Sequence, residues 1–347
     1  MTQTNAYEPI LSARNTGIHF RVGKNQILKA VDGVSLDVLR GETFGIIGES
    51  GSGKTTLGRA LICLERPASG EIFHNGIDPF TLTQRELREH RRQFQMIFQD
   101  PNAALNPRMT ILRSVKEPLD TVGTLPDVRR TEIALEMMQR VGLSADFARR
   151  YPHELSGGQK QRVCIARVLT LNPALIVCDE AIAALDVSIQ ADVLNLLADL
   201  QKEFGLTYVF ITHNLGVVSH ISDRVAVMYL GRIVEMGATE EIMQMPLHPY
   251  TEALLSAEPQ AVPPSMRSGT RIVLDGELPS PISPPSGCRF RTRCRFAQDV
   301  CAQKDPDWRE VLPGRLVACH FAGELKLETE AQRLLRVPVA SEGSKDV

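Results

Sequence analysis

Two glycine-rich segments of this sequence have the composition of phosphate-binding loops. The first is GESGSGKT at residues 48–55, and the second is LSGGQ at residues 155–159. In a GxxxxGK(S/T) loop, glycines let backbone N–H groups close around phosphates, while the lysine supplies positive charge and the hydroxyl binds magnesium. Lys54 and Thr55 hold these two positions. The first segment therefore predicts a P-loop for a nucleoside triphosphate, a feature that many ATPases and GTPases share.

The residues around the first loop predict the strand, loop and helix order that a P-loop requires. Residues 43–47 form a compact apolar run typical of a strand, and residues 55–64 have a helical pattern. The N-terminus of such a helix exposes unpaired N–H groups and the positive end of the helix dipole, which together hold phosphates. We expect the nucleotide to be bound by the loop residues Gly48, Glu49, Ser50, Gly51, Ser52, Gly53, Lys54, Thr55 and Thr56.

The second segment predicts another anion site. LSGGQ precedes a strong helical pattern at residues 160–171, which places Ser156 at a helix N-cap. Gly157 and Gly158 allow close approach of the backbone, and the Ser156 hydroxyl with nearby amides is suited to bind an anion. One compact domain rarely needs two such sites for one nucleotide.

Two acidic residues follow another apolar run of the sequence. Residues 174–178 are typical of a buried parallel strand, and Asp179 and Glu180 come directly after it. Ligands of open α/β sheets bind at the carboxyl ends of the strands. We therefore expect Asp179 to hold magnesium through its water shell, and Glu180 to orient or deprotonate the water that attacks the nucleotide.

Five segments occur here in the order that is typical of one family of ATPases. They are GESGSGKT, LSGGQ, the acid pair, ALD at residues 184–186 and TH at residues 212–213. This series resembles the ATP-binding cassette (ABC) family. The resemblance implies an α/β fold, with a P-loop (RecA-like) ATPase core, an antiparallel β layer and an inserted α-helical subdomain. Short extended segments separated by turn residues at 18–39 predict the antiparallel β layer. Helical patterns at residues 111–122 and 128–141 predict the inserted helical subdomain.

The resemblance also implies roles for single residues. Gln99, at the end of a short strand expected over residues 95–99, reaches magnesium and the attacking water, and the loop beyond it receives a membrane subunit. His213 approaches the γ-phosphate, and Asp186 shapes the contact between two subunits. Phe20 stacks on adenine, although an ordinary half-buried strand residue is the alternative. Thr55, Gln99 and Asp179 form the magnesium site, and Ser156, Gly157, Gly158 and Gln159 close on ATP in the P-loop of a facing subunit.

Three positions depart from the usual family pattern. Asn214 replaces an acid after His213, and Ala181 and Ile182 replace a proline and a threonine after Glu180. Because the chemical groups stay in place, we still expect an active ATPase in which Glu180, His213, Gln99 and Lys54 carry the catalysis. Lys54, His213 and magnesium are the candidates for neutralising charge on the γ-phosphate.

Composition limits the class of partner. The formal charge of -2 provides no net positive field for nucleic acid, so we expect no nucleic-acid partner. No apolar stretch approaches the roughly 18 to 20 residues that cross a bilayer. The polar start MTQTNAYEP lacks the basic segment followed by an apolar segment that is typical of a secretion signal. We expect a cytoplasmic location. Cys63, Cys164 and Cys178 lie singly in predicted helices or strands and are expected to be small buried hydrophobes.

The other cysteines form a cluster near the carboxyl end. Cys288, Cys294, Cys301 and Cys319 have the spacing Cx5Cx6Cx17C. Four thiolates suit a 4Fe–4S cluster or tetrahedral zinc, and free reduced thiols are the third possibility. Neighbouring arginines favour an iron–sulfur cluster because they offset its negative charge, although a basic surface for another partner is a rival use of them. These arginines are Arg289, Arg291, Arg293 and Arg295.

The carboxyl-terminal third carries a more specific resemblance. PLHPY at residues 246–250 and GELPSPISPPSGC at residues 276–288 resemble the ATPase subunits of oligopeptide and dipeptide importers. The resemblance favours the iron–sulfur cluster and implies ATP, Mg²⁺, two membrane permease subunits and a second ABC ATPase, expected to be a paralogue in a heterodimer. A solute-binding protein belongs to the complex without touching this chain. We predict peripheral attachment to the cytoplasmic side of the cell membrane.

The predicted domain organisation follows the same resemblance. An ABC nucleotide-binding domain spans residues 1–258, with the helical subdomain at about 100–158. A small Cys-rich appendage spans residues 259–325, where seven prolines between Pro259 and Pro285 favour an extended segment over a new strand. A tail expected to be flexible spans 326–347. Rival functions are import of another solute, such as nickel, glutathione or an opine-like compound, and a soluble ABC ATPase that acts on DNA or ribosomes.

Overall fold

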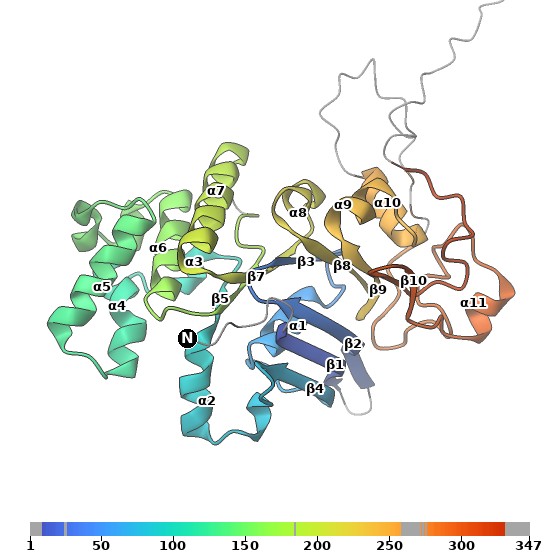
Figure 1. Ribbon diagram of the computed structural model, residues 1–347, viewed down its shortest axis with the longest axis horizontal. Coiled ribbons are helices and arrows are strands. Elements are labelled where there is room, and N and C mark those ends of the chain that lie inside the picture. Colours follow the sequence, from blue (N-terminus) through green and yellow to red (C-terminus); the bar gives the residue numbers. More distant parts are fainter. Residues whose placement is uncertain are drawn as a thin grey trace, which may run out of the picture.

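The structure is a computed structural model that describes residues 9–23, 26–183, 185–257, 272, 274 and 276–329. Its centre is an eight-stranded sheet in the order β10-β11-β9-β8-β3-β7-β6-β5 (Figure 1). The strands β5, β6, β7, β3 and β8 run parallel, whereas β9, β11 and β10 join them as an antiparallel edge. The strands of this sheet are β3 (Thr43–Ile47), β5 (Phe94–Ile97), β6 (Leu175–Asp179), β7 (Thr207–Thr212), β8 (Arg224–Tyr229), β9 (Arg232–Ala238), β10 (Arg309–Leu312) and β11 (Arg315–Val317).

A second, antiparallel layer packs under one face of this sheet. It has the strand order β2-β1-β4, with β1 (Pro9–Val22), β2 (Gln26–Leu39) and β4 (Ser69–His74). The helix α1 (Lys54–Leu61) packs in the apolar core between the two sheets. The layer predicted at residues 18–39 is therefore confirmed, although β1 begins earlier, at Pro9.

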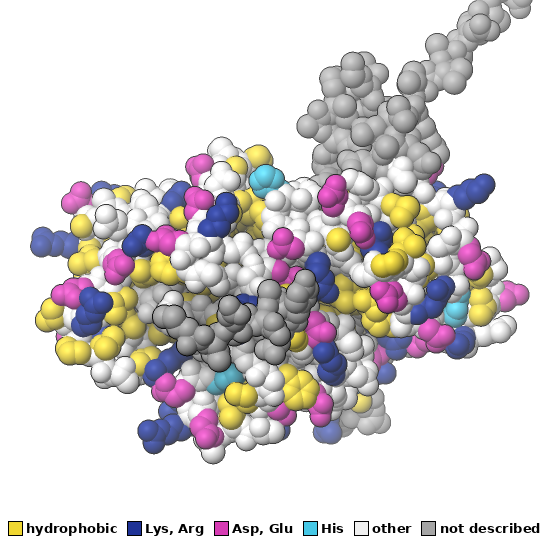
Figure 2. Space-filling model, viewed as in Figure 1, with side chains coloured by type: hydrophobic (Ala, Val, Ile, Leu, Met, Phe, Trp, Pro, Cys, Tyr) yellow, Lys and Arg dark blue, Asp and Glu magenta, His cyan; other side chains and the backbone are white. Residues whose placement is uncertain are grey.

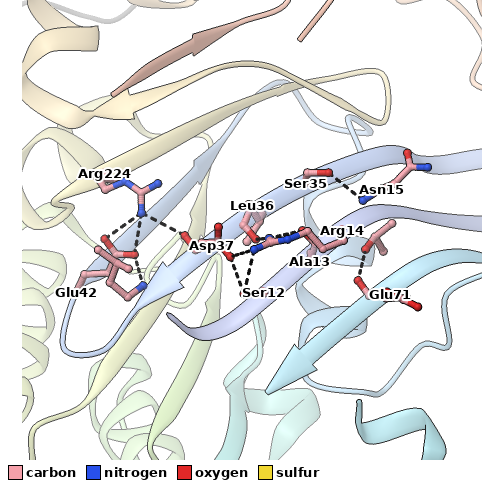
Figure 3. A network of polar contacts seen from close by, with 12 residues as sticks. Ser12, Ala13, Arg14, Asn15, Ser35, Leu36, Asp37, Glu42, Glu71 and Arg224 are labelled. Carbon is pink, nitrogen blue, oxygen red and sulfur yellow. Dashed lines mark hydrogen bonds and ion pairs between the residues drawn. The ribbon is translucent and has the colours of Figure 1, made fainter. Parts of the chain in front are cut away.

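Polar contacts of Arg224 link the two layers beside β2 (Figure 3). The Arg224 guanidinium at the start of β8 donates to Glu42 and to the backbone carbonyl of Asp37, both at 3.2 Å. The Asp37 carboxylate in turn accepts a hydrogen bond from Arg14 of β1 at 2.6 Å. Because β3 follows directly after Glu42, these contacts fix the start of the strand that leads into the P-loop.

The two helices predicted over residues 111–122 and 128–141 are present as α4 and α5 and lie at one end of the molecule (Figure 1). Residues of α4 and α5 share an apolar core with α6, β6 and β7. The predicted boundaries shift slightly, because α6 begins at Gly157 instead of residue 160. The elements of this region are α2 (Gln84–His90), α3 (Pro101–Ala104), α4 (Ile111–Val122), α5 (Asp127–Arg140), α6 (Gly157–Leu169) and α7 (Val187–Phe204), with 3-10 turns η1 (Pro79–Thr81), η2 (Arg91–Gln93), η3 (Ala145–Arg149) and η4 (Pro152–Glu154).

The carboxyl-terminal extension contributes to the central sheet. Strand β11 pairs with β9 of the core, and Arg315 of β11 forms an ion pair with Glu235 of β9 in which both side chains are buried. Glu235 also accepts the backbone N–H groups of Leu247 and His248. This buried network fixes the extension to the core. The remaining helices are α8 (Leu215–Ile221), α9 (Thr239–Gln244), α10 (Pro249–Ala257) and α11 (Asp299–Gln303).

Some predictions fall on segments that the structure does not describe. Pro259, Pro263 and Pro264 of the proline-rich segment lie outside the described residues, as do Ala184 and the tail from residue 330 onward. Residues 276–286, which hold the other prolines, form no strand. In the described part of the chain, none of the helices has the length and apolar character needed to span a bilayer.

Candidate nucleotide site

The P-loop lies between β3 and α1, as predicted, and its glycines are required by the backbone. Gly48 has φ 153° and Gly53 has φ 102°, which is the left-handed region. A Cβ at Gly48 would lie 2.1 Å from the Met228 carbonyl oxygen, and one at Gly53 would lie 2.1 Å from that of Ala30. Larger residues at either position would therefore push the loop away from β8 and β2.

The side chain of the P-loop lysine, Lys54, points into the loop. Lys54 Nζ donates to the carbonyl oxygens of Gly48 and Glu49, each at 2.8 Å, and the side chain is only 5% exposed. Burial lowers the pKa of Lys54, and the nearby carboxylates of Glu180, Asp179 and Glu49 oppose this shift. The loop thus contains a cation that has lost most of its water and is available to an anion.

The first acid of the pair lies beside the P-loop threonine. Asp179 is the last residue of β6, and its Oδ1 accepts a hydrogen bond from Thr55 Oγ1 at 2.9 Å. Burial raises the pKa of this carboxyl, while the Thr55 hydrogen bond lowers it. A hydroxyl and a carboxylate oxygen are the ligands that Mg²⁺ prefers, so this donor set fits the ion.

The second acid is held in an uncommon conformation. Glu180 has φ 45°, which is uncommon for a residue with a side chain, and its N–H donates to the Ile211 carbonyl of β7 at 2.9 Å. Its carboxylate accepts Gln99 Nε2 at 2.7 Å and lies 3.1 Å from His213 Nδ1. The structure therefore brings Gln99, Glu180 and His213 together from the ends of three neighbouring strands, although β5 ends two residues before Gln99.

The LSGGQ segment forms the start of α6. The Ser156 hydroxyl accepts the backbone N–H of Gln159 at 3.3 Å, and the Gln159 side chain accepts the Ser156 N–H at 2.9 Å. This reciprocal pair is a capping box. Ser156 and Gly157 are exposed, and among the described residues no hydrogen bond or ion pair joins this segment to the P-loop. The segment predicted to bind a second anion is therefore open to solvent at Ser156 and Gly157.

Two predicted residues lie at the margin of the site. Asp186 precedes α7 as its N-cap, accepts no capping hydrogen bond and is exposed, and the next residue, Val187, is 83% exposed. Phe20 lies in β1 opposite Leu28 of β2 and packs partly against the core between the sheets. The roles predicted for Asp186 and Phe20 stay predictions.

The four clustered cysteines, all among the described residues, form no disulfide bonds. Burial raises the pKa of Cys288, Cys294 and Cys319 to about 11. Within the described residues, no group of three or more His, Cys, Asp or Glu side chains is arranged to hold a metal ion. The metal prediction therefore gains no support from this geometry. Three of the thiols accept the backbone N–H two residues later, Cys288 from Phe290, Cys294 from Phe296 and Cys319 from Phe321.

The sequence patterns did not predict one contact of the P-loop. Arg293, which directly precedes Cys294, donates to both carboxylate oxygens of Glu49 at 2.7 and 3.1 Å. The Tyr250 hydroxyl accepts the Glu49 N–H at 2.8 Å. Because 244 positions separate Glu49 from Arg293, no local pattern indicates this pair.

A mainly parallel sheet with a P-loop and carboxylates at the strand ends defines a P-loop nucleoside triphosphatase. The ABC transporter family model matches residues 31–183, and the model of the oligopeptide/dipeptide transporter C-terminal region matches residues 234–301. The chain is 50% identical over 315 residues to the putative oligopeptide transport ATP-binding protein YkfD of Bacillus subtilis, covering 90% of this chain and 95% of that protein. It is also 50% identical over 328 residues to the oligopeptide transport ATP-binding protein AppF of the same organism, covering 92% and 99%.

Solved structures agree with this assignment. The ATP-binding cassette MJ0796, in a dimeric structure bound to ADP and Pi, matches with a TM-score of 0.60 and 33% identity over 66% of this chain and 98% of that one. The cbiO1 protein of Clostridium perfringens matches with a TM-score of 0.60 and 28% identity over 67% of this chain and 90% of that one. The chain therefore belongs to the ABC transporter ATP-binding family, in the branch with the oligopeptide/dipeptide C-terminal region, and it is an ATPase.

Proposed function

We propose that this chain hydrolyses ATP to energise the import of di- or oligopeptides through separate membrane permease subunits. The relatives named for oligopeptide transport, and the matching C-terminal region, support this cargo. The observation that carries the hydrolytic part is the Glu180 carboxylate, held between Gln99 and His213. Its neighbour Asp179 pairs with the P-loop hydroxyl of Thr55.

In this proposal, different residues of the chain bind the phosphates, hold magnesium and activate the attacking water. The loop N–H groups and Lys54 bind the β- and γ-phosphates, and His213 adds a donor for the γ-phosphate. Magnesium, when bound, neutralises charge on the phosphates, and the residues that would hold it are Thr55, Gln99 and Asp179. Glu180 takes a proton from the attacking water, or orients that water for attack.

Each active site is proposed to be completed by a facing subunit. In this proposal the exposed Ser156 and Gly157 contact the γ-phosphate of ATP bound to the other P-loop, and Asp186, which is also exposed at the start of α7, lies in the contact between the subunits. MJ0796 has been solved as a dimer. ATP binding would then close two ATPase subunits, with a paralogue as the second, and hydrolysis would release them.

A hollow next to Gln99 is suited to receive a permease segment from the cytoplasmic side of the membrane. A cavity of about 570 Å³ lies between α2, β5, α4 and α6, with Phe98 in its wall. Figure 2 shows apolar side chains gathered over the α4 and α5 end of the molecule. Because Phe98 adjoins Gln99, a segment in this cavity would be coupled to the nucleotide site. The arginines in its lining are Arg85, Arg88, Arg91, Arg92 and Arg167.

Transport by the assembled complex tests this function. We expect the chain, purified with its permeases and placed in vesicles, to drive ATP-dependent uptake of a labelled peptide when a peptide-binding protein is added. The matched control is the same complex with Glu180→Gln, which should take up no peptide. Uptake of nickel or glutathione without peptide uptake, or co-purification with ribosomes in place of permeases, would contradict the proposal.

The four clustered thiols are proposed to hold a 4Fe–4S cluster, with zinc as the alternative. The support for this is chemical and not geometric, because soft thiolates bind both. We expect protein purified without oxygen to contain about four iron atoms per chain, with thiolate-to-iron absorption bands. Cys294→Ser should abolish both, and Cys164→Ala, at a single buried cysteine of α6, should keep them. Stoichiometric zinc, or no metal, would refute the cluster.

A further inference from the structure

We propose that Arg293 is a positioning residue for nucleotide binding, which neutralises the single carboxylate of the P-loop and holds it away from the phosphates. Glu49 is the only acidic residue in the loop GESGSGKTT. A carboxylate in a loop that binds a triphosphate would repel its ligand unless it is paired. The inference rests on the nucleotide site proposed above, and it adds a residue that belongs to the cysteine-rich segment.

The geometry is that of a strong ion pair. Two Nη atoms of Arg293 reach two carboxylate oxygens of Glu49, and the Arg293 side chain is 9% exposed while that of Glu49 is 29% exposed. The hydrogen bond to Glu49 is the main cause that raises the pKa of Arg293 above its usual range. Bidentate arginine–carboxylate pairs fix direction as well as charge. Arg293 therefore sets where the Glu49 carboxylate points.

Glu49 is held at its backbone as well as its side chain. Its N–H donates to the Tyr250 hydroxyl, and its carbonyl accepts Lys54 Nζ, each at 2.8 Å. Tyr250 is fully buried and contacts Phe290, from the cysteine-rich segment, with ring centroids 5.4 Å apart. The P-loop residue is thus anchored by α10 and by the cysteine-rich segment together.

Loss of Arg293 would affect Lys54 directly. The charge of Glu49 already acts on Lys54, together with Glu180 and Asp179. A released Glu49 carboxylate would compete with the phosphates for the Lys54 ammonium and add a negative charge to the loop. Both effects weaken the binding of an anionic nucleotide, and both depend on the charge of Glu49 instead of on the folding of the extension.

The extension contains a matched contact that does not reach the P-loop. Arg295 donates to both carboxylate oxygens of Glu252 in α10, at 2.8 and 2.9 Å. This pair also joins the cysteine-rich segment to the core by an arginine–glutamate contact, here made by one Nη atom. Its loss would loosen the extension without freeing a charge in the loop.

The test compares the affinity of the full chain for AMP-PNP with magnesium, measured by calorimetry. Because Arg293→Met loses its charge-assisted ion pair with Glu49, its Kd should be about tenfold higher than that of the parent chain. A tenfold change in Kd corresponds to about 1.4 kcal/mol. Adding Glu49→Gln to this variant should restore the Kd to within about threefold of the parent, because the repelling charge is gone. The loss in Arg293→Met should also shrink as salt is raised. Arg295→Met should bind like the parent.

Several results would overturn the inference. They are parental affinity in Arg293→Met, failure of Glu49→Gln to restore binding, and an equal loss in Arg295→Met. If Arg293→Met does not fold, as judged by thermal unfolding, Arg293→Lys replaces it. Lysine keeps the positive charge but lacks the guanidinium that makes two hydrogen bonds. The Kd of Arg293→Lys for AMP-PNP should therefore stay within about threefold of the parent, and a larger loss of affinity would contradict the neutralising role of Arg293. A parent chain that binds no nucleotide would instead contradict the site itself.

Discussion

Glu180→Gln is expected to lower steady-state ATP hydrolysis by about 10²- to 10⁴-fold while ATP binding is retained. The amide keeps the size of the carboxylate and can still hydrogen bond to Gln99 and His213, but it cannot accept a proton from water. The phosphate contacts come from the P-loop and Lys54, which the substitution leaves in place. Phosphate release and equilibrium binding of ATP, measured on the same preparation, check the two parts separately.

The control is a glutamate that lies outside the site. Glu136→Gln, in α5, replaces an exposed carboxylate that contacts only Arg140 among the described ion pairs, so it should hydrolyse ATP at the parental rate. Hydrolysis by Glu180→Gln at a tenth of the parental rate or more would contradict the assignment. The base would then have to be sought among its neighbours, beginning with His213 at 3.1 Å.

Ser156→Asp is expected to lower hydrolysis by about 100-fold or more, with little change in the affinity of the same chain for ATP. Aspartate is as good an N-cap as serine, so α6 should keep its start. The new negative charge, however, would lie where the γ-phosphate held by the facing subunit is proposed to bind. The kcat of the assembled ATPase and the Kd for ATP of the isolated chain measure the two effects.

Ser156→Asn provides the neutral counterpart of this variant. Asparagine has nearly the shape of aspartate and also caps helices well, so it should keep α6 intact and lose far less activity. The difference between the two variants isolates the charge. If both lose activity equally, or if Ser156→Asp also abolishes ATP binding by the isolated chain, the outward-facing role of the LSGGQ segment is wrong.

Local sequence patterns predicted the centre of this fold because its elements are short and specified by neighbouring residues. The strand Thr43–Ile47 has the predicted bounds, and the helix after the P-loop begins one residue before the predicted position. Gln99, Glu180 and His213 follow three apolar runs that become neighbouring parallel strands, so their meeting follows from the common edge of the sheet. These features needed no knowledge of long-range contacts.

The features that the sequence did not reveal depend on distant partners. Strands β10 and β11 are short, and they belong to the central sheet only because β11 pairs with β9 and β10 pairs with β11. The positive φ of Glu180 occurs together with a backbone hydrogen bond to Ile211 of the next strand. The pairing of Glu49 with Arg293 likewise brings together residues from opposite ends of the chain.

The most direct measurement of the central claim is ATP turnover per chain before and after the facing subunit is removed. The chain is proposed to supply the P-loop of one site and the LSGGQ segment of another, so a complete site exists only in the pair. We predict near-background turnover for the strictly monomeric fraction from size exclusion, and recovery when the second copy or its paralogue is added back. Full turnover by the monomer, unchanged by Ser156→Asp, would contradict the account.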